Sequence, residues 1–245
     1  MRLDRLLYEK SLVESREKAK ALIMQGSVTV NGNVVDKAGT LVDVNASLNI
    51  ENKMPFVSRG GLKLDHAISE FHISADGLIA MDIGASTGGF TDCLLQQGSK
   101  KVYAVDVGYG QLHWKLRNDE RVVILEKTNI RHLSKDDIQD EIDLITIDVS
   151  FISLTKVIPK ALEFLKPSGE VIALIKPQFE AGRKDVGKGG VVRDEKKREE
   201  VVNRIKGECK IIGLIVEGVT ESPIKGPKGN IEYLIYLKRS SGDQL

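Results

Sequence analysis

A glycine-rich segment, Met81-Asp-Ile-Gly-Ala-Ser-Thr-Gly-Gly-Phe-Thr-Asp92, has the residue types of a loop that binds a nucleoside cofactor. The apolar run Leu78–Met81 before it predicts a buried strand, and Phe90–Leu95 predicts the start of a helix. A strand, a glycine-rich turn and a helix N-terminus together present free backbone N–H groups to a ligand. The segment therefore predicts a nucleoside-binding site.

Two polar residues further along the chain are candidates for contacts to that nucleoside. Lys101-Val-Tyr-Ala-Val-Asp106 reads as a second buried strand, and Asp106 at its tip can accept hydrogen bonds from ribose hydroxyls. Asn129 follows the third predicted strand and is placed to meet the amino edge of an adenine. Asn is also common in turns, so a purely structural role for Asn129 is the alternative.

The spacing of the glycines separates two kinds of cofactor. A dinucleotide-binding loop has the form G-x-G-x-x-G, and its second glycine admits a pyrophosphate. Here Ser86 stands at that second position after Gly84, which disfavours NAD. Asp82 favours S-adenosylmethionine, because a carboxylate there can orient the loop and attract a sulfonium or amino cation. We expect cofactor contacts from Asp82, Gly84, Ala85, Ser86, Thr87, Gly88, Gly89, Phe90, Asp106, Val107, Asn129 and Asp148.

Apolar runs that alternate with helical stretches must position this loop. The predicted strands are Ile79–Asp82, Val102–Asp106, Val122–Glu126, Leu144–Asp148 and Val171–Ile175. A helix is predicted over Leu154–Leu165, closed by Lys166-Pro-Ser-Gly169. Nearly continuous apolar strands separated by helices indicate a parallel sheet covered on both faces.

The C-terminal part has a different pattern. Lys210–Val219 and Glu232–Leu237 read as strands, and the Pro/Gly-rich loop between them is too short for a crossover helix, so they should pair antiparallel. The sequence thus predicts an α/β, Rossmann-like class I methyltransferase fold: a mostly parallel seven-stranded sheet with an antiparallel terminal hairpin. We place this domain at residues 58–245.

Residues 1–52 form a predicted small α+β domain, joined by a linker at 53–57. Leu3, Leu6 and Leu7 have helical spacing, and Ser15 is a candidate N-cap for a second helix, Arg16–Met24, which Gly26 would end. Two short strands follow, Ser27–Val30 and Leu48–Ile50, with Asn31-Gly32 as a tight turn.

Composition narrows the classes of function. The net charge is +1, so a nucleic-acid partner would need local basic patches. Cys93 and Cys209 lack His or Cys neighbours, which indicates reduced thiols in a cytoplasmic protein and no metal site. No apolar run is long enough to span a bilayer, and charges interrupt the N-terminus, so neither a membrane span nor a signal peptide is expected. A monomer is compatible with the sequence.

Five motifs in order resemble the TlyA family of ribosomal RNA 2′-O-methyltransferases, which are often labelled hemolysin A. The resemblance covers essentially the whole chain, because residues 1–52 resemble the S-four RNA-binding domain named after a ribosomal small-subunit protein. In the family a short Arg-x-Trp segment links the two domains, and Lys53-Met-Pro-Phe56 stands in its place here. The motifs are Ser58–Leu64, Asp82–Asp92, Ile147–Leu154, Ile175–Glu180 and Ser222–Tyr233.

The resemblance implies S-adenosylmethionine as cofactor and methyl transfer to a cytidine ribose in ribosomal RNA of ribosomal subunits. It also implies a catalytic tetrad, shared with FtsJ-type enzymes, at Lys63, Asp148, Lys176 and Glu232. A ribose hydroxyl must lose its proton as it attacks the methyl, and Lys176 is our choice of general base. Lys63 can supply a second cation, and the two acids can orient the lysines. Taken singly, each of the four could instead be a surface or turn residue.

RNA contacts are expected from basic residues in both domains and from one aromatic residue. In the first domain acidic residues lie among the basic ones, so a helix pair laced with ion pairs is the alternative. The loop Ala181–Gly190 is basic, and it could order on RNA or be a plain connector. The expected residues are Arg2, Arg5, Arg16, Lys18, Lys20, Arg59, Phe179, Arg183, Lys184 and Lys188.

Three other functions compete with RNA methylation. A ribosome-binding assembly factor with an inactive methyltransferase domain would keep the RNA contacts without the chemistry. A membrane-active hemolysin is suggested by the family label, although no amphipathic or transmembrane segment supports it. An NAD oxidoreductase is the most distant alternative.

Overall fold

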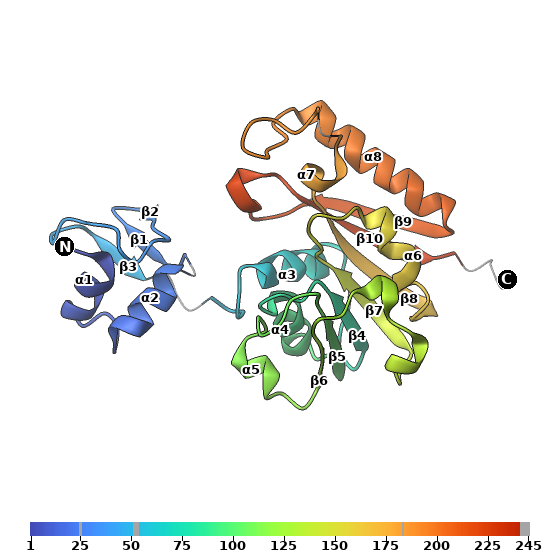
Figure 1. The fold of residues 1–245 in the computed structure, drawn as a ribbon, viewed down its shortest axis with the longest axis horizontal. Coiled ribbons are helices and arrows are strands. Elements are labelled where there is room, and N and C mark those ends of the chain that lie inside the picture. The colour runs from blue at the N-terminus through green and yellow to red at the C-terminus, as the bar shows by residue number, and fades with distance from the viewer. Residues whose placement is uncertain (25, 51–53, 183, 241–245) are drawn as a thin grey trace. The chain divides into compact units, whose positions relative to one another are not determined.

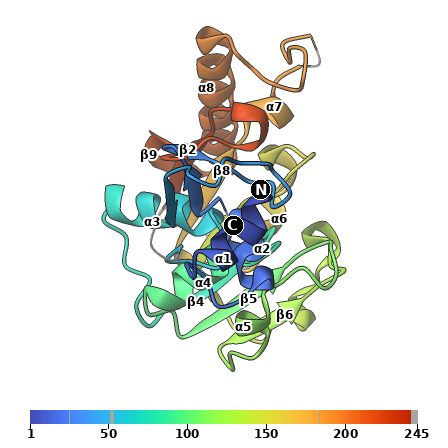
Figure 2. The same cartoon turned by 90° about the vertical axis from the view of Figure 1, so that its left-hand side faces the viewer.

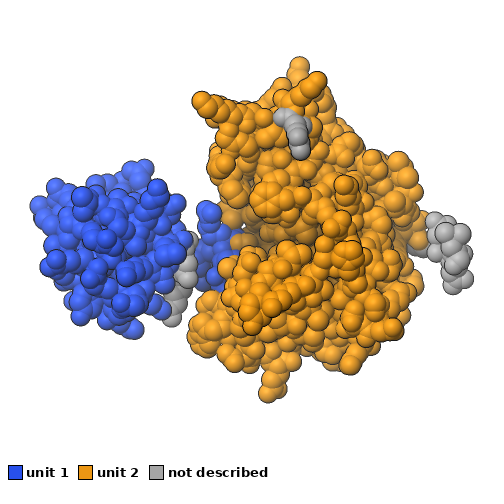
Figure 3. Space-filling view, viewed as in Figure 1, with its two compact units in different colours: residues 1–59 blue, residues 60–245 orange. Residues whose placement is uncertain are grey.

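The computed structural model describes residues 1–24, 26–50, 54–182 and 184–240, and it divides into two compact units, Met1–Arg59 and Gly60–Leu245 (Figure 3). The predicted linker starts at Lys53, which lies outside the described residues, as does Arg183. None of the described helices is both long and apolar enough to cross a membrane.

The first unit packs two helices against a small antiparallel sheet. Its elements are α1 (Leu3–Glu9), α2 (Arg16–Met24), β1 (Val28–Val30), β2 (Asn33–Val34) and β3 (Leu48–Ile50), with strand order β2-β1-β3. The Ser15 hydroxyl accepts a hydrogen bond from the Lys18 N–H at 3.1 Å, as expected of an N-cap. Asn31 and Gly32 turn the chain with φ of 51° and 80°. The core consists of Leu3, Leu7, Ala19, Ile23 and Val28.

The second unit is built on a seven-stranded sheet with the order β6-β5-β4-β7-β8-β10-β9 (Figure 1). Five strands run parallel, and β10 pairs antiparallel with both β8 and β9, as the sequence predicts. The chain order reverses between β4 and β7, and the carboxyl ends of such strands form the ligand crevice of open α/β sheets. The strands are β4 (Ile79–Ile83), β5 (Lys101–Val105), β6 (Val122–Leu125), β7 (Ile142–Ile147), β8 (Leu165–Ile175), β9 (Leu214–Glu221) and β10 (Tyr233–Arg239).

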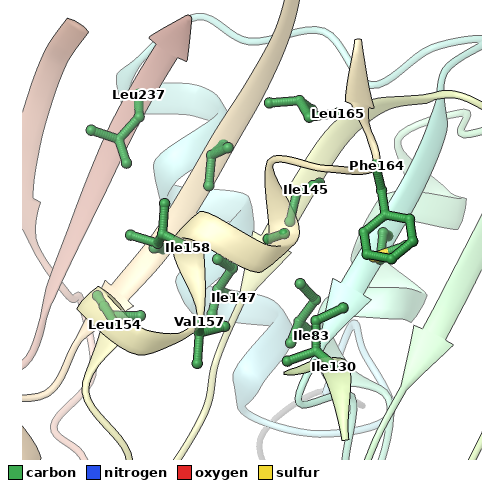
Figure 4. Close-up of a cluster of buried hydrophobic side chains, with 14 of the residues drawn as sticks. Ile83, Ile130, Ile145, Ile147, Leu154, Val157, Ile158, Phe164, Leu165 and Leu237 are labelled. Carbon is green, nitrogen blue, oxygen red and sulfur yellow. The ribbon is translucent and has the colours of Figure 1, made fainter. Parts of the chain in front are cut away.

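Helices cover this sheet on both faces. On one face α3 (Gly60–Glu70) contacts β10, and α4 (Gly89–Gln96) contacts β4 and β5. On the other face α8 (Glu195–Ile211) lies beside β9, as Figures 1 and 2 both show. The apolar cluster on the second face joins sheet residues such as Ile145 and Ile147 to α6 (Ile158–Ala161) (Figure 4). The remaining short helices are α5 (Trp114–Arg117) and α7 (Pro177–Glu180).

Two predicted elements were wrong in extent. The helix predicted over 154–165 is split into a 3₁₀ turn, Leu154–Lys156, and α6, and β8 already begins at Leu165. Residues 166–169 do not close a helix, because they form a bulge of β8: Ile142 pairs with Leu165, and Leu144 pairs with Glu170. The Lys166 ammonium lies 2.6 Å from a carboxylate oxygen of Asp143 on β7 and holds this bulge to its neighbour.

The second error concerns the strand predicted over 210–219. Lys210 and Ile211 belong to the end of α8, and β9 starts only at Leu214. Gly213, with φ of 79°, turns the chain between them. Apolar Ile211 looks like a strand residue in the sequence, yet it is 82% exposed at the helix end. Apolar character alone therefore misplaced the boundary.

Candidate active site

The glycine-rich loop runs from the end of β4 to the start of α4, and two of its glycines are required by packing. Gly84 has φ of 90°, and a Cβ there would lie 2.5 Å from the carbonyl oxygen of Asp148. Gly88 has φ of 95°, and its Cβ would lie 2.2 Å from Leu116 Cδ1. Both positions combine a left-handed backbone with a close neighbour, which only glycine accommodates without strain. The sequence motif thus records a backbone constraint.

Asp106, at the carboxyl end of β5, holds the loop through backbone hydrogen bonds. Its Oδ2 accepts from the N–H of Ser86 at 2.8 Å, and its Oδ1 accepts from the N–H of Gly108 at 2.6 Å. A carboxylate oxygen can accept more than one hydrogen bond. Asp106 can therefore fix the loop and still accept from a ligand hydroxyl.

A cavity of about 1030 Å³ lies beside this loop, at the carboxyl ends of β4, β5 and β7. Six of the predicted cofactor residues line it: Gly84, Ser86, Asp106, Val107, Asn129 and Asp148. The volume is in the range of pockets that enclose nucleoside-sized ligands. Sequence reasoning missed Gln111, Thr128, Arg131, Ser150 and Phe151, which also line the cavity and carry no recognisable spacing.

The other predicted cofactor residues do not line this cavity. They are Asp82, Ala85, Thr87, Gly88, Gly89 and Phe90. Asp82 is fully buried and accepts hydrogen bonds from the hydroxyls of Thr91, at 2.7 Å, and Thr146, at 3.2 Å. Burial raises the pKa of Asp82 to about 7, and the nearby Asp148 carboxylate adds to this shift. Asp82 therefore joins β4 to α4 and β7, and its direct contact with a cofactor stays a prediction.

Asn129 lines the cavity but uses its side-chain oxygen within the protein. Its Oδ1 accepts a hydrogen bond from the Arg131 N–H at 3.1 Å and so caps the 3₁₀ turn Ile130–His132. Asn129 therefore has the structural role in a turn that was the alternative in the sequence analysis. The contact of Asn129 with an adenine stays a prediction.

The four residues of the expected tetrad lie in the second unit as two lysine–carboxylate pairs. Lys63 on α3 lies with its Nζ 2.6 Å from Glu232 Oε2, and the two residues are only 7% and 0% exposed. Lys176 follows β8, and its Nζ lies 2.5 Å from Asp148 Oδ1, at the end of the neighbouring strand β7. The angles at this second contact are not those of a hydrogen bond, so it is an ion pair only.

The two pairs are neighbours across the sheet. Tyr233 pairs with Ile175 where β10 meets β8, so the adjoining residues Glu232 and Lys176 come next in register. Lys176 also donates a hydrogen bond to the Ser150 hydroxyl at 3.0 Å. Lys63, Lys176 and Glu232 are buried and so are not exposed surface residues, whereas Asp148 lies in the loop after β7 and its catalytic role stays a prediction.

Gln178 also belongs to this cluster, although no sequence pattern singles it out. Its Nε2 donates to Glu232 Oε1 at 2.9 Å, so the acid is bonded by both Lys63 and Gln178. Because a carboxylate only accepts, the amide orientation of Gln178 is fixed. Its Oε1 is buried without a hydrogen-bond partner among the described residues.

An aromatic pair stands at the rim of the cavity. The rings of Phe151 and Phe179 are 4.7 Å apart between centroids, and Lys176 Nζ lies 6.0 Å from the Phe179 ring centre. Phe151 is 89% exposed and has φ of 64°, which is rare for a bulky residue. Strained, exposed aromatic residues beside ionisable groups are typical of functional sites.

The basic residues expected to contact RNA have mixed surroundings. In the first unit Arg2 and Arg16 both pair with buried Asp4 at 3.0 Å, and Arg5 pairs with Glu9 at 2.7 Å. These three arginines thus form ion pairs within the domain, as the alternative to RNA contact predicted. Hydrogen bonds from Arg2 and Arg16 hold the pKa of Asp4 well below its usual range. All three arginines are nevertheless exposed, as are Lys18, Lys20, Arg59, Lys184 and Lys188.

No cluster of three or more His, Cys, Asp or Glu side chains suited to a metal ion occurs within the described ranges. Both cysteines, Cys93 and Cys209, are free and buried.

The fold and site define a class I methyltransferase preceded by a small α+β domain, and family comparisons agree. Residues 56–239 match the FtsJ-like methyltransferase family, and residues 1–48 match the S4 domain. The chain belongs to the TlyA family of FtsJ-like methyltransferases.

Relatives span nearly the full length of the chain. A candidate rRNA methyltransferase of Bacillus subtilis, YqxC, is 51% identical, covering 96% of this chain and 85% of its own. The 16S/23S rRNA (cytidine-2′-O)-methyltransferase TlyA of Mycobacterium tuberculosis is 42% identical, covering 97% and 89%. The solved structure of a candidate hemolysin from Streptococcus thermophilus has a TM-score of 0.78 at 45% identity, covering 98% and 88%.

Proposed function

We propose that this protein transfers the methyl group of S-adenosylmethionine to the 2′-oxygen of a cytidine ribose in ribosomal RNA. The observation that carries the proposal is that two lysine–carboxylate pairs, Lys63–Glu232 and Lys176–Asp148, lie at one edge of the sheet, where β7 and β8 end and β10 begins, and that Asp148 also lines the cavity. The substrate is taken from the name of the Mycobacterium tuberculosis relative and from the S4 domain.

The cavity suits the cofactor in shape and in its polar groups. Asp106 has acceptor capacity left for ribose hydroxyls, and Gly84 and Ser86 line the cavity, while the N–H groups of residues 84–86 already donate to Val105 and Asp106. Asp148 lies between the cavity and Lys176, so its carboxylate is close to both the methyl donor and the base. When bound, S-adenosylmethionine supplies an electrophilic methyl group.

Lys176 acts as the general base in this scheme. It accepts the proton of the 2′-hydroxyl as the ribose oxygen attacks, and for this it must first be a neutral amine. The hydrogen bond to Ser150 positions the Lys176 nitrogen beside the Asp148 carboxylate, and in its neutral form the amine has a lone pair for the substrate proton. The remaining demand is alignment of the ribose oxygen with the methyl group, which the fixed strand ends provide.

Lys63 provides a fixed positive charge next to the base. Glu232 and Gln178 hold it in a buried position, where its charge is poorly screened. A cation there stabilises the negative charge that develops on the ribose oxygen and attracts the adjoining phosphate. The Phe151–Phe179 pair offers a surface on which an unpaired base of the target nucleotide can stack.

The test is methyl transfer from labelled S-adenosylmethionine to purified ribosomal subunits. Wild-type protein should methylate ribose, and Lys176→Ala should reduce the rate by about 10²–10⁴-fold while RNA binding is retained. Lys197→Ala is the matched control, because Lys197 forms an exposed ion pair with Glu200 on α8, in the helix that covers the sheet. Mapping ribose methylation in rRNA from cells with and without the protein would identify the nucleotide.

Two outcomes would favour the other functions. RNA binding by wild-type protein without any methyl transfer would favour an assembly factor. Leakage of lipid vesicles by pure protein, unchanged in Lys176→Ala, would favour a hemolysin.

A further inference from the structure

The basic loop between α7 and α8, residues 182–193, ends in an anchored segment. A bridge between Gly187 and Val191 closes the loop on itself, and Val192 is only 2% exposed. Before this anchor, Lys184 and Lys188 point into solvent. The loop therefore exposes its lysine side chains while its C-terminal end is buried.

Asn230, in the loop between β9 and β10, makes this anchor. It is 3% exposed, and its Oδ1 accepts from the Val192 N–H at 3.2 Å. Its Nδ2 donates to the carbonyl of Gly190 at 3.0 Å and to that of Pro227 at 3.1 Å. One side chain thus joins two loops that are 38–40 residues apart in the sequence.

The same residue shapes the loop that covers Glu232. The Asn230 carbonyl accepts from the Gly226 N–H at 2.8 Å, which brings Gly226 against the buried acid. A Cβ at Gly226 would lie 2.1 Å from Glu232 Oε1, so the backbone touches the carboxylate directly. Asn230 is therefore linked on one side to the basic loop and on the other to the Lys63–Glu232 pair.

A second side chain ties the basic loop to the start of β10. Arg198 on α8 donates from Nη1 to the carbonyl of Arg193 at 2.7 Å and from Nε to the Tyr233 hydroxyl at 3.3 Å. Tyr233 directly follows Glu232. Arg198 therefore holds both the end of the basic loop and the residue that follows the tetrad acid Glu232.

The surface formed by the two joined loops is basic. Lys184, Lys188, Lys225 and Lys228 are exposed on it, and Lys228 Nζ lies 3.9 Å from the Cβ position of Gly190. The exposed acids on or next to these loops are Asp185, Asp194, Glu195 and Glu221. Lysines brought together in this way attract phosphate groups.

We propose that Asn230 is a positioning residue that couples RNA binding by the basic loop to the Lys63–Glu232 pair. This coupling rests on the proposed function. Phosphate groups of the bound RNA immobilise both loops by contacting Lys184, Lys188, Lys225 and Lys228. Because Gly226 in the second loop lies against Glu232, the position of that carboxylate is then fixed as well. The basic loop then contributes to the rate of methyl transfer as well as to RNA affinity.

Amide hydrogen exchange on the full-length protein, with and without ribosomal subunits, tests the coupling without relying on activity. In wild-type protein the subunits should slow exchange in both 184–192 and 222–231. In the background Lys225→Ala/Lys228→Ala, where the second loop has no lysine of its own for phosphate, the subunits should still slow exchange in both segments, and adding Asn230→Ala should confine the slowing to 184–192. Asn230→Asp keeps the acceptor for Val192 and loses both donated bonds, so it gives the same test if the alanine variant folds poorly. Equal protection of both loops in these variants would overturn the proposal.

Kinetics provide a second, independent test. Asn230→Ala should lower kcat about tenfold with S-adenosylmethionine affinity unchanged, whereas Asn203→Ala, at an exposed position on α8, should change neither. In a double-mutant cycle with Lys184→Ala/Lys188→Ala, the effects on kcat should be less than additive. Strict additivity, or a matching loss of cofactor affinity, would contradict the coupling. Coupled protection without methyl transfer by wild-type protein would instead leave the coupling standing and remove the proposed function.

Discussion

Lys63 and Glu232 are 169 residues apart in the sequence, and their side chains meet at 2.6 Å in the interior of the second unit. Burying both partners of an ion pair removes their hydration, and the attraction between them compensates for this loss only in part. Such a pair is therefore a poor device for stability alone. Its position next to Lys176 supports the role in catalysis that we propose for it.

The first prediction separates these two roles. Glu232→Gln leaves the Lys63 ammonium buried without its counter-charge, and loss of one partner of a buried pair costs about 3–5 kcal/mol. The double variant Lys63→Met/Glu232→Gln removes both charges, so its free energy of unfolding should return most of the way to the wild-type value. Methyl transfer should nevertheless stay abolished. Urea denaturation and methylation assays on the same samples would check this, and a double variant that regains activity would contradict the assigned role.

The second prediction concerns Asp82 and pH. The pKa of this buried acid is raised to about 7, while in an unfolded chain it stays near the ordinary aspartate value of 3.8. Between these values the folded protein holds a proton that the unfolded chain releases, so Asp82 lowers stability progressively as pH rises from about 4 to about 7. Asp82→Asn cannot ionise, and its amide can still bond to the hydroxyls of Thr91 and Thr146.

The measurement is the free energy of unfolding of both proteins from pH 4 to pH 8. The advantage of Asp82→Asn over wild type should grow up to about pH 7 and then level off. A difference that is independent of pH would show that Asp82 titrates alike in the folded and unfolded states. Taking the difference between the two proteins cancels the contribution of other titrating groups.

How far the sequence alone predicted this site depends on the range of the interactions. Gly84 and Asp106 were identifiable because a loop and the acid of the next strand are close in the chain, and their spacing reflects local backbone geometry. Which lysine pairs with which acid could not be predicted, because Lys63 on α3 and Glu232 before β10 meet only in the folded protein. Gln178 gave no signal either, since its amide acquires meaning only through Glu232. The 154–165 helix failed for a similar reason: pairing of β8 with β7 decided the conformation of residues 165–169.

The third prediction tests the close approach of backbone to the acid. Gly226→Ala would place a methyl group 2.1 Å from Glu232 Oε1, so the carboxylate or the loop must shift. Methyl transfer should fall by at least tenfold, while S-adenosylmethionine affinity stays close to wild type because Gly226 does not line the cavity. Gly207→Ala is the matched control: a Cβ there meets nothing within 4 Å on α8. That control should keep its activity and gain about 0.5–1 kcal/mol of stability.

The last prediction concerns Phe151 as a stacking surface. Its side chain is 89% exposed, so Phe151→Ala removes little buried area and should leave the free energy of unfolding almost unchanged. Stacking of a base on an aromatic ring contributes about 1–3 kcal/mol, which corresponds to a loss of about 5- to 150-fold in kcat/KM for RNA. Phe151→Trp retains an aromatic face and should restore most of the rate, although the positive φ at this position is unfavourable for any bulky residue. Calorimetry of S-adenosylmethionine binding tests whether Phe151 contacts the RNA nucleotide or the cofactor. A loss of RNA turnover at unchanged cofactor affinity would assign the ring to the nucleotide. Equal losses of turnover and cofactor affinity would assign it to the cofactor cavity and contradict the stacking role.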